Sequence, residues 1–181
     1  MSNVPKSRRK KHDFLANHEL RTIRIRITEL AINDFGYDRE RFERKIEKYE
    51  NSLSSFDRKP EVVAKWRKKN ESYFADFVEE ETKETRDILR RAVMEFELGN
   101  SIFPEGDAKL VEFCERRKHL DRAIGWLHCM KQELQYIAEI LPCDKNQYVS
   151  IQETIDHEIS LIKGVRRAGN KFLKPDKEKQ K

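Results

Sequence analysis

Acidic and histidine side chains are the first residues to consider for chemistry, because a carboxylate and an imidazole on one helix face can bind a metal or transfer a proton. Two such pairs are spaced by four residues, Glu115 with His119 and Glu153 with His157. Di-iron bundles instead use Glu-x-x-His, and no histidine here follows a glutamate by three residues. Pairs at a spacing of four are more often surface hydrogen bonds or ion pairs. With no P-loop, dinucleotide-binding glycine motif or nucleophile elbow either, we predict no catalytic residue, no metal site and no cofactor.

Lysine and arginine give a stronger signal. Near the C-terminus they recur at helical spacing where the apolar pattern fades: Lys163, Arg166, Arg167, Lys171 and Lys174. Arg116 and Arg117 begin the preceding helical segment, so an antiparallel hairpin would bring them to the same end. A basic cluster built from separate segments is typical of proteins that contact nucleic-acid phosphates. The alternative is a solvated face with cations favourably placed at a helix C-terminus.

The charge along the chain is unevenly distributed. Residues 1–26 hold eight Lys and Arg against two acids, and residues 163–181 hold the same numbers, so each end carries +6. With a net charge of +5, the residues between them carry −7. Basic ends favour contact with a polyanion. The N-terminal run Arg8, Arg9, Lys10 and Lys11 is either a nucleic-acid-binding arm or a solvated tail, and the sequence favours neither.

The elements that must position these residues are helices. Apolar residues return at spacings of three, four and seven, which predicts helices over 13–34, 38–56, 61–98, 108–141 and 147–171. The fold class is all-α, an antiparallel four-helix-bundle-like domain with a long protruding N-terminal helical arm. We expect a disordered basic arm over 1–12, one bundle domain over 13–175 and a disordered tail over 176–181. The predicted core is Leu120, Ile124, Leu127, Leu134, Ile155, Ile159 and Ile162.

Several local signals refine this picture. Gly36 is placed for a left-handed helix end, and Asp38 for the N-cap of the next helix. No Gly or Pro interrupts 61–98, so one continuous helix is favoured, with its polar middle, 79–87, crossing solvent. A break near Glu81 is the alternative. Ile102 and Phe103 should plug one end of the bundle.

The small residues allow further expectations. Three cysteines cannot all pair with one another, so we expect them reduced, with Cys114 and Cys129 as small core residues of a cytoplasmic protein. Close helix packing would explain Gly125 and Gly164 inside helical patterns. No apolar run approaches the roughly 20 residues that span a bilayer, so we expect no membrane contact.

The segments ERRKHLDRAIGWLHCMKQELQYIAEILP and IDHEISLIKGVRRAGNKF resemble four-helix-bundle accessory proteins encoded beside reverse transcriptases. The likeness is to the accessory variability determinant type of diversity-generating retroelements, and it covers about the C-terminal third. The resemblance implies a non-catalytic, ring-forming homo-oligomer whose basic surfaces hold template RNA and the reverse transcriptase. The matching basic positions are Lys163, Arg166, Arg167 and Lys171, with Arg116 and Arg117. The N-terminal half of this chain is longer than that of compact members of the family.

Three functional hypotheses follow. The first is an RNA-binding accessory subunit of a reverse transcriptase, based on the charge distribution and the resemblance. The second is a helical oligomerisation module with no nucleic-acid role, based on the coiled-coil-like seam from Phe42 to Phe56. The third, a metal-dependent bundle enzyme, has the least support.

Overall fold

The computed structural model describes residues 11–173, with side chains described from Leu15 onward. Within that range the chain forms five α-helices: α1 (Lys11–Ile32), α2 (Arg39–Ser52), α3 (Pro60–Ser101), α4 (Lys109–Ile140) and α5 (Asn146–Gly169). Short 3-10 turns are η2 (Asp34–Gly36), η3 (Gly106–Ala108) and η4 (Asn170–Leu173). The all-α prediction is confirmed, and each helix boundary lies within four residues of the predicted one.

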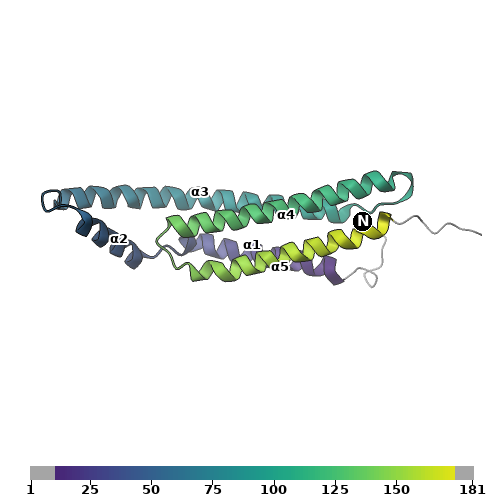
Figure 1. Cartoon of the computed structure of the whole chain (residues 1–181), viewed down its shortest axis with the longest axis horizontal. Helices are drawn as coiled ribbons and strands as arrows, with labels where there is room; N and C mark the ends of the chain where they lie inside the picture. Colours follow the sequence, from purple (N-terminus) through teal and green to yellow (C-terminus); the bar gives the residue numbers. More distant parts are fainter. Residues whose placement is uncertain (1–10, 174–181) are drawn as a thin grey trace, which may run out of the picture.

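Four of the helices, α1, α3, α4 and α5, lie side by side as an antiparallel bundle (Figure 1). Polar side-chain contacts join neighbouring helices of the bundle. Arg26 of α1 donates to the Thr154 hydroxyl of α5 at 2.7 Å, and Lys131 of α4 pairs with Asp156 of α5 at 2.6 Å. α1 also packs on α3, and α3 on α4, which closes the ring of four helices.

The arm consists of α2 and the first part of α3, and it protrudes from the bundle (Figure 1). α3 has 42 residues and spans about 63 Å at 1.5 Å per residue, so it extends well past the 32 residues of α4. α2 folds back onto this extension. Phe42 meets Phe74 edge to face, and the Tyr49 ring stacks on Trp66 with centroids 4.5 Å apart. The apolar seam of α2 is therefore mostly used inside the chain.

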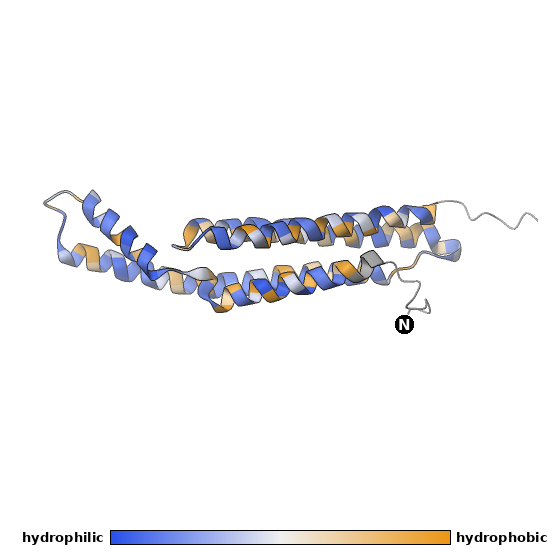
Figure 2. Ribbon diagram, turned by 90° about the horizontal axis from the view of Figure 1, so that it is seen from below, coloured by the Kyte–Doolittle hydropathy of each residue, from blue (hydrophilic) through white to orange (hydrophobic). Residues whose placement is uncertain are grey.

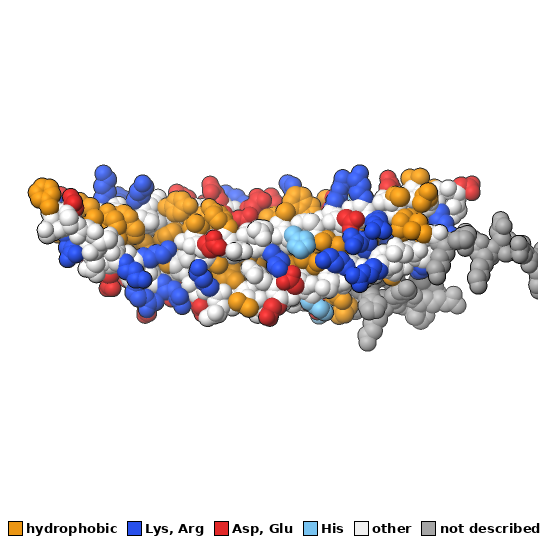
Figure 3. Space-filling model, viewed as in Figure 1, with side chains coloured by type: hydrophobic (Ala, Val, Ile, Leu, Met, Phe, Trp, Pro, Cys, Tyr) orange, Lys and Arg blue, Asp and Glu red, His pale blue; other side chains and the backbone are white. Residues whose placement is uncertain are grey.

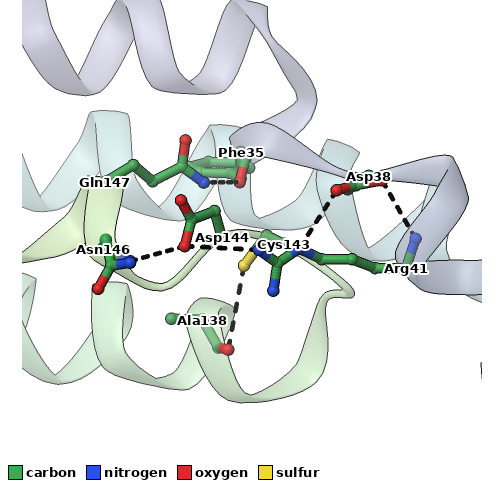
Figure 4. A network of polar contacts seen from close by, with 8 residues as sticks. All are labelled: Phe35, Asp38, Arg41, Ala138, Cys143, Asp144, Asn146 and Gln147. Carbon is green, nitrogen blue, oxygen red and sulfur yellow. Dashed lines mark hydrogen bonds and ion pairs between the residues drawn. The ribbon is translucent and has the colours of Figure 1, made fainter.

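The turn from α1 to α2 is hydrogen-bonded to the first turn of α5 (Figure 4). Asp34, Phe35 and Gly36 all have positive φ, of 49°, 53° and 71°, and Phe35 is fully buried. The Phe35 carbonyl accepts from the Tyr148 hydroxyl at 2.7 Å and from the Gln147 amide at 3.2 Å. These bonds offset the strain of a left-handed non-glycine residue. The left-handed conformation predicted at Gly36 is confirmed.

The predicted N-cap at Asp38 is confirmed as well, because its carboxylate accepts from the backbone N–H of Arg41 at 3.1 Å. The Asp38 N–H in turn donates to the Pro142 carbonyl at 2.8 Å, and Arg41 pairs with Asp144 at 3.7 Å. The first residues of α2 are thereby attached to the loop that joins the two C-terminal helices.

The core runs along the axis of the bundle, and the hydrophobic and hydrophilic residues alternate along each helix (Figure 2). Every predicted core residue is buried, and Leu127 and Leu134 are inaccessible to solvent. Helical spacing was sufficient to identify them, since each side chain lies on the stripe that faces the neighbouring helices.

The prediction that the polar middle of α3 crosses solvent is wrong. The helix is continuous, but its polar middle does not cross solvent, because Glu81 and Thr85 are buried in the bundle. α1 packs on this stretch, which the sequence pattern of α3 alone does not reveal. The buried Thr85 hydroxyl donates a hydrogen bond to the Glu81 backbone carbonyl at 2.6 Å. Burial, and then a hydrogen bond to Glu133, raise the pKa of Glu81 to about 8.

Two expectations about small residues are wrong. Cys114 and Cys129 are exposed, because each follows an inward-facing position of α4 by one or two residues and so points outward. Gly125 and Gly164 are not sites of close packing, since a Cβ added to either would meet nothing within 4 Å. The close approach is at Gly99, where an added Cβ would lie 3.0 Å from Leu120 Cγ.

Candidate nucleic-acid interface

The last turns of α5 and the following η4 carry a row of cations directed away from the core. Lys163 and Arg166 are partly exposed, while Arg167 and Lys171 are exposed. Val165 and Gly169 occupy the buried side of the same turns. Cations at a helix C-terminus also interact favourably with the helix dipole, so this arrangement costs the fold little.

The start of α4 lies beside this row, as the hairpin predicts. Asp121 of α4 forms an ion pair with Arg166 and lies 4.0 Å from the Arg117 guanidinium. One carboxylate thus links two cations from helices that are far apart in sequence. We call Arg117, Lys163, Arg166, Arg167 and Lys171 the basic cluster. Figure 3 shows Lys and Arg side chains gathered on this part of the bundle.

Arg116 has a different position from the rest of the predicted set. It is only 8% exposed, and its Nη1 donates to the carbonyls of Gly99 at 2.9 Å and Ile102 at 2.8 Å. Helix C-termini leave backbone carbonyls without intrahelical partners, and Arg116 satisfies those of α3. Because its guanidinium is committed to the backbone, Arg116 is left out of the interface. The sequence contained a signal for this position. Phe113, Arg116 and Leu120 are spaced by three and four residues, so Arg116 shares the inward face of α4, whereas Arg117 does not.

Several predicted binding residues lie outside the described part of the chain. These are Arg8, Arg9, Lys10 and Lys174. Lys11 is the first residue of α1, but its side chain is not described either.

The helical arm formed by α2 and the first part of α3 is a basic region that the sequence interpretation missed. Residues 39–72 hold eleven Lys and Arg against seven acids, a net charge of +4. Exposed cations on both of its helices include Arg44, Lys48, Lys65, Lys68 and Lys69. Blue side chains over the arm are visible in Figure 3. Averaging the charge over the whole middle of the chain hid this excess, and a count over the α2–α3 hairpin alone would have found it.

The histidine–carboxylate pairing differs from the one expected. His119 Nδ1 lies 2.6 Å from Glu95 of α3 rather than pairing with Glu115, and Arg122 approaches the other Glu95 oxygen at 3.8 Å. This group ties α3 to α4. In the described residues, no group of three or more His, Cys, Asp or Glu side chains is arranged to hold a metal ion.

Glu158 is the most unusual ionisable residue. It lies in the middle of α5, is fully buried, and neither carboxyl oxygen has a hydrogen-bond partner among the described residues. Burial, and then the nearby Glu19 carboxylate, raise its pKa to about 9. Glu158 is therefore protonated and neutral near pH 7. The sequence analysis did not single out Glu158, since a glutamate within a helical pattern gives no sign of how completely it is enclosed.

Together these features define a helical bundle with a basic arm at one end and a basic cluster at the other. None of the protein-family models, curated proteins or solved structures compared with the chain matches it. No helix within residues 11–173 combines the length and apolarity needed to cross a membrane.

Proposed function

We propose that this chain is a non-catalytic RNA-binding accessory subunit of a reverse transcriptase, of the kind found in diversity-generating retroelements. The basic cluster would hold template RNA through its phosphates, and a homo-oligomer would present several such clusters. The observation that supports RNA binding is that Arg117 of α4 and Arg166 of α5 both pair with Asp121, which brings cations from the two helices together. The reverse transcriptase part rests on the sequence resemblance alone.

Electrostatics support a phosphate contact rather than a base contact. Arg117, Arg167 and Lys171 are exposed and have long, flexible side chains, which position a backbone without reading sequence. Asp121 neutralises part of the cluster, so the cations that bind phosphate most directly are Lys163, Arg167 and Lys171. The basic arm offers a second surface for the same polyanion.

The test uses single-stranded RNA of about 12 nucleotides, a length within the range that one binding site covers. Fluorescence anisotropy would be measured between about 50 and 200 mM salt. Lys163→Glu with Arg167→Glu should weaken binding and flatten the salt dependence by about 1.4 in log–log slope, because two phosphate contacts at about 0.7 each are lost. This pair avoids Arg166, whose reversal would place a carboxylate against Asp121.

The matched control is Arg86→Glu with Lys145→Glu, which makes the same change in charge at exposed positions of α3 and of the loop between α4 and α5. It should leave the salt slope close to that of the original chain. If both double variants bind equally well while remaining folded, the cluster is only a solvated face. Co-purification with a reverse transcriptase encoded at the same locus tests the second half of the proposal.

A helical interaction module with no nucleic-acid role is the second candidate. Leu110 and Val111 at the start of α4 are each 64% exposed, and Ile32 at the end of α1 is 74% exposed. Light scattering of the purified chain, with and without RNA, separates the two. An oligomer that binds no RNA at low salt would favour this candidate.

A further inference from the structure

An aromatic pair occupies the surface at the end of the bundle that carries the basic cluster. Phe103, in the loop after α3, meets Phe172 of η4 edge to face, with ring centroids 5.2 Å apart at 80°. The sequence predicted that Phe103 plugs the bundle, but it is 51% exposed. The neighbouring residue Pro104 is buried instead, as is Phe113 of α4. The Phe103 ring is therefore available at the surface.

A cation accompanies the two rings. Lys171 Nζ lies 4.7 Å from the Phe172 centroid and 5.9 Å from the Phe103 centroid. The three side chains line a depression open to solvent, together with residues 104–106 of the loop. Arg167 of the basic cluster precedes Lys171 by four residues, so the positive charge continues from α5 to the rings.

We propose that Phe103, Phe172 and Lys171 form a stacking subsite for an unpaired base of single-stranded RNA. Aromatic rings accept the face of any base, and a neighbouring cation holds the adjoining phosphate. Glu105 and Lys109 also line the depression, and their opposite charges offset each other. The RNA backbone would therefore pass on the α5 side, where Lys171 and Arg167 add further positive charge. The inference rests on the proposed RNA-binding function and gives it a class of ligand, single-stranded rather than duplex RNA.

The stacking subsite and the basic cluster can be distinguished by experiment, because substitutions in the two should change the salt dependence of RNA binding differently. Phe103→Leu keeps an apolar side chain of similar size and removes only the ring. It should weaken binding of the labelled 12-nucleotide RNA by at least about fivefold, the lower end of what one stacked base contributes. The salt slope should not change, because no phosphate contact is lost. Phe103→Trp should restore binding.

The chain offers a matched control on α4. Tyr136 is 45% exposed and its ring meets the Phe77 ring edge to face at 5.6 Å, but it belongs to neither the basic cluster nor the arm. Tyr136→Leu should bind the same RNA as the original chain does. A fully paired duplex of equal charge should be insensitive to Phe103→Leu, because its bases are already stacked.

The outcomes distinguish this inference from the proposed function. If Phe103→Leu binds within twofold of the original chain while Lys163→Glu with Arg167→Glu weakens binding, the subsite is refuted and the RNA function stands. If the original chain binds no RNA at low salt, both fail. Should Phe103→Leu unfold, RNA carrying 2-aminopurine reports on the original chain instead, where quenching of the base supports stacking and its absence overturns it. An equal loss for duplex and single-stranded RNA also overturns the inference.

Discussion

Replacing Glu158 with methionine should stabilise the protein markedly and remove part of the pH dependence of its unfolding free energy. The Glu158 carboxyl is fully buried and has a pKa of about 9, against 4.5 for an exposed glutamate. At pH 7 the carboxyl of the unfolded chain is ionised, because the pH lies about 2.5 units above its pKa. Folding requires that carboxyl to be protonated, which costs about 1.4 kcal/mol for each of these units. That amounts to about 3–4 kcal/mol, a large part of the 5–15 kcal/mol typical of a domain.

The direction of the pH effect follows from proton binding. The pKa of Glu158 is higher in the folded chain than in the unfolded chain, so the folded state binds more protons between about 4.5 and 9. The free energy of unfolding is then greatest below pH 4.5 as far as this group is concerned, and it falls as pH rises towards 9. Glu81 acts in the same direction, so only the difference between Glu158→Met and the original chain isolates Glu158.

The assay is urea unfolding at pH 5, 6, 7 and 8 with a common slope. Methionine matches the length of the glutamate side chain and leaves no polar atom without a partner. The gain from Glu158→Met should grow by about 4 kcal/mol from pH 5 to pH 8, while Glu153→Met on the exposed side of α5 should show no such growth. A gain that is constant across this pH range would mean that Glu158 is ionised in the folded protein, and the reasoning from its burial would be refuted.

Three further substitutions test the packing. Leu127→Ala should lower the free energy of unfolding by about 2–5 kcal/mol in chemical denaturation, because Leu127 is inaccessible to solvent and leaves a cavity; a loss under about 0.5 kcal/mol would contradict that position. Gly36→Ala should cost at least about 1 kcal/mol by the same measurement, since the added Cβ would lie 2.0 Å from the Gln147 side chain at a φ of 71°. Arg116→Met should cost about 1–3 kcal/mol and lower the melting temperature, because the Gly99 carbonyl loses its donor; an unchanged melting temperature would place the guanidinium in solvent.

The sequence predicted the helices and their inward faces well because both depend on local periodicity. Leu127 and Ile155 belong to stripes that any helical projection displays, and burial follows once two stripes face each other. The turn at Phe35 could not be predicted in the same way. A left-handed phenylalanine is tolerated only because Tyr148, more than a hundred residues away, donates to its carbonyl.

The candidate site shows the same division. Helical spacing located Arg167 and Lys171, and the hairpin topology placed Arg117 near the end of α5, where it and Arg166 both pair with Asp121. Residue type alone could not separate Arg117 from Arg116, since both are arginines and only the rotation of α4 decides which one faces the end of α3. Phe103 was misassigned for a related reason, because loop residues follow no periodicity and an apolar side chain in a loop carries no signal of exposure.

Burial also changes the charge that an anionic partner meets. The formal net charge of +5 counts Glu81 and Glu158 as ionised, but their pKa values of about 8 and about 9 leave both largely protonated at pH 7. The folded chain then carries close to +7, and the acidic middle close to −5 rather than −7. Protonation of these two buried carboxyls therefore weakens the repulsion that the middle of the bundle exerts on a polyanion held at its ends.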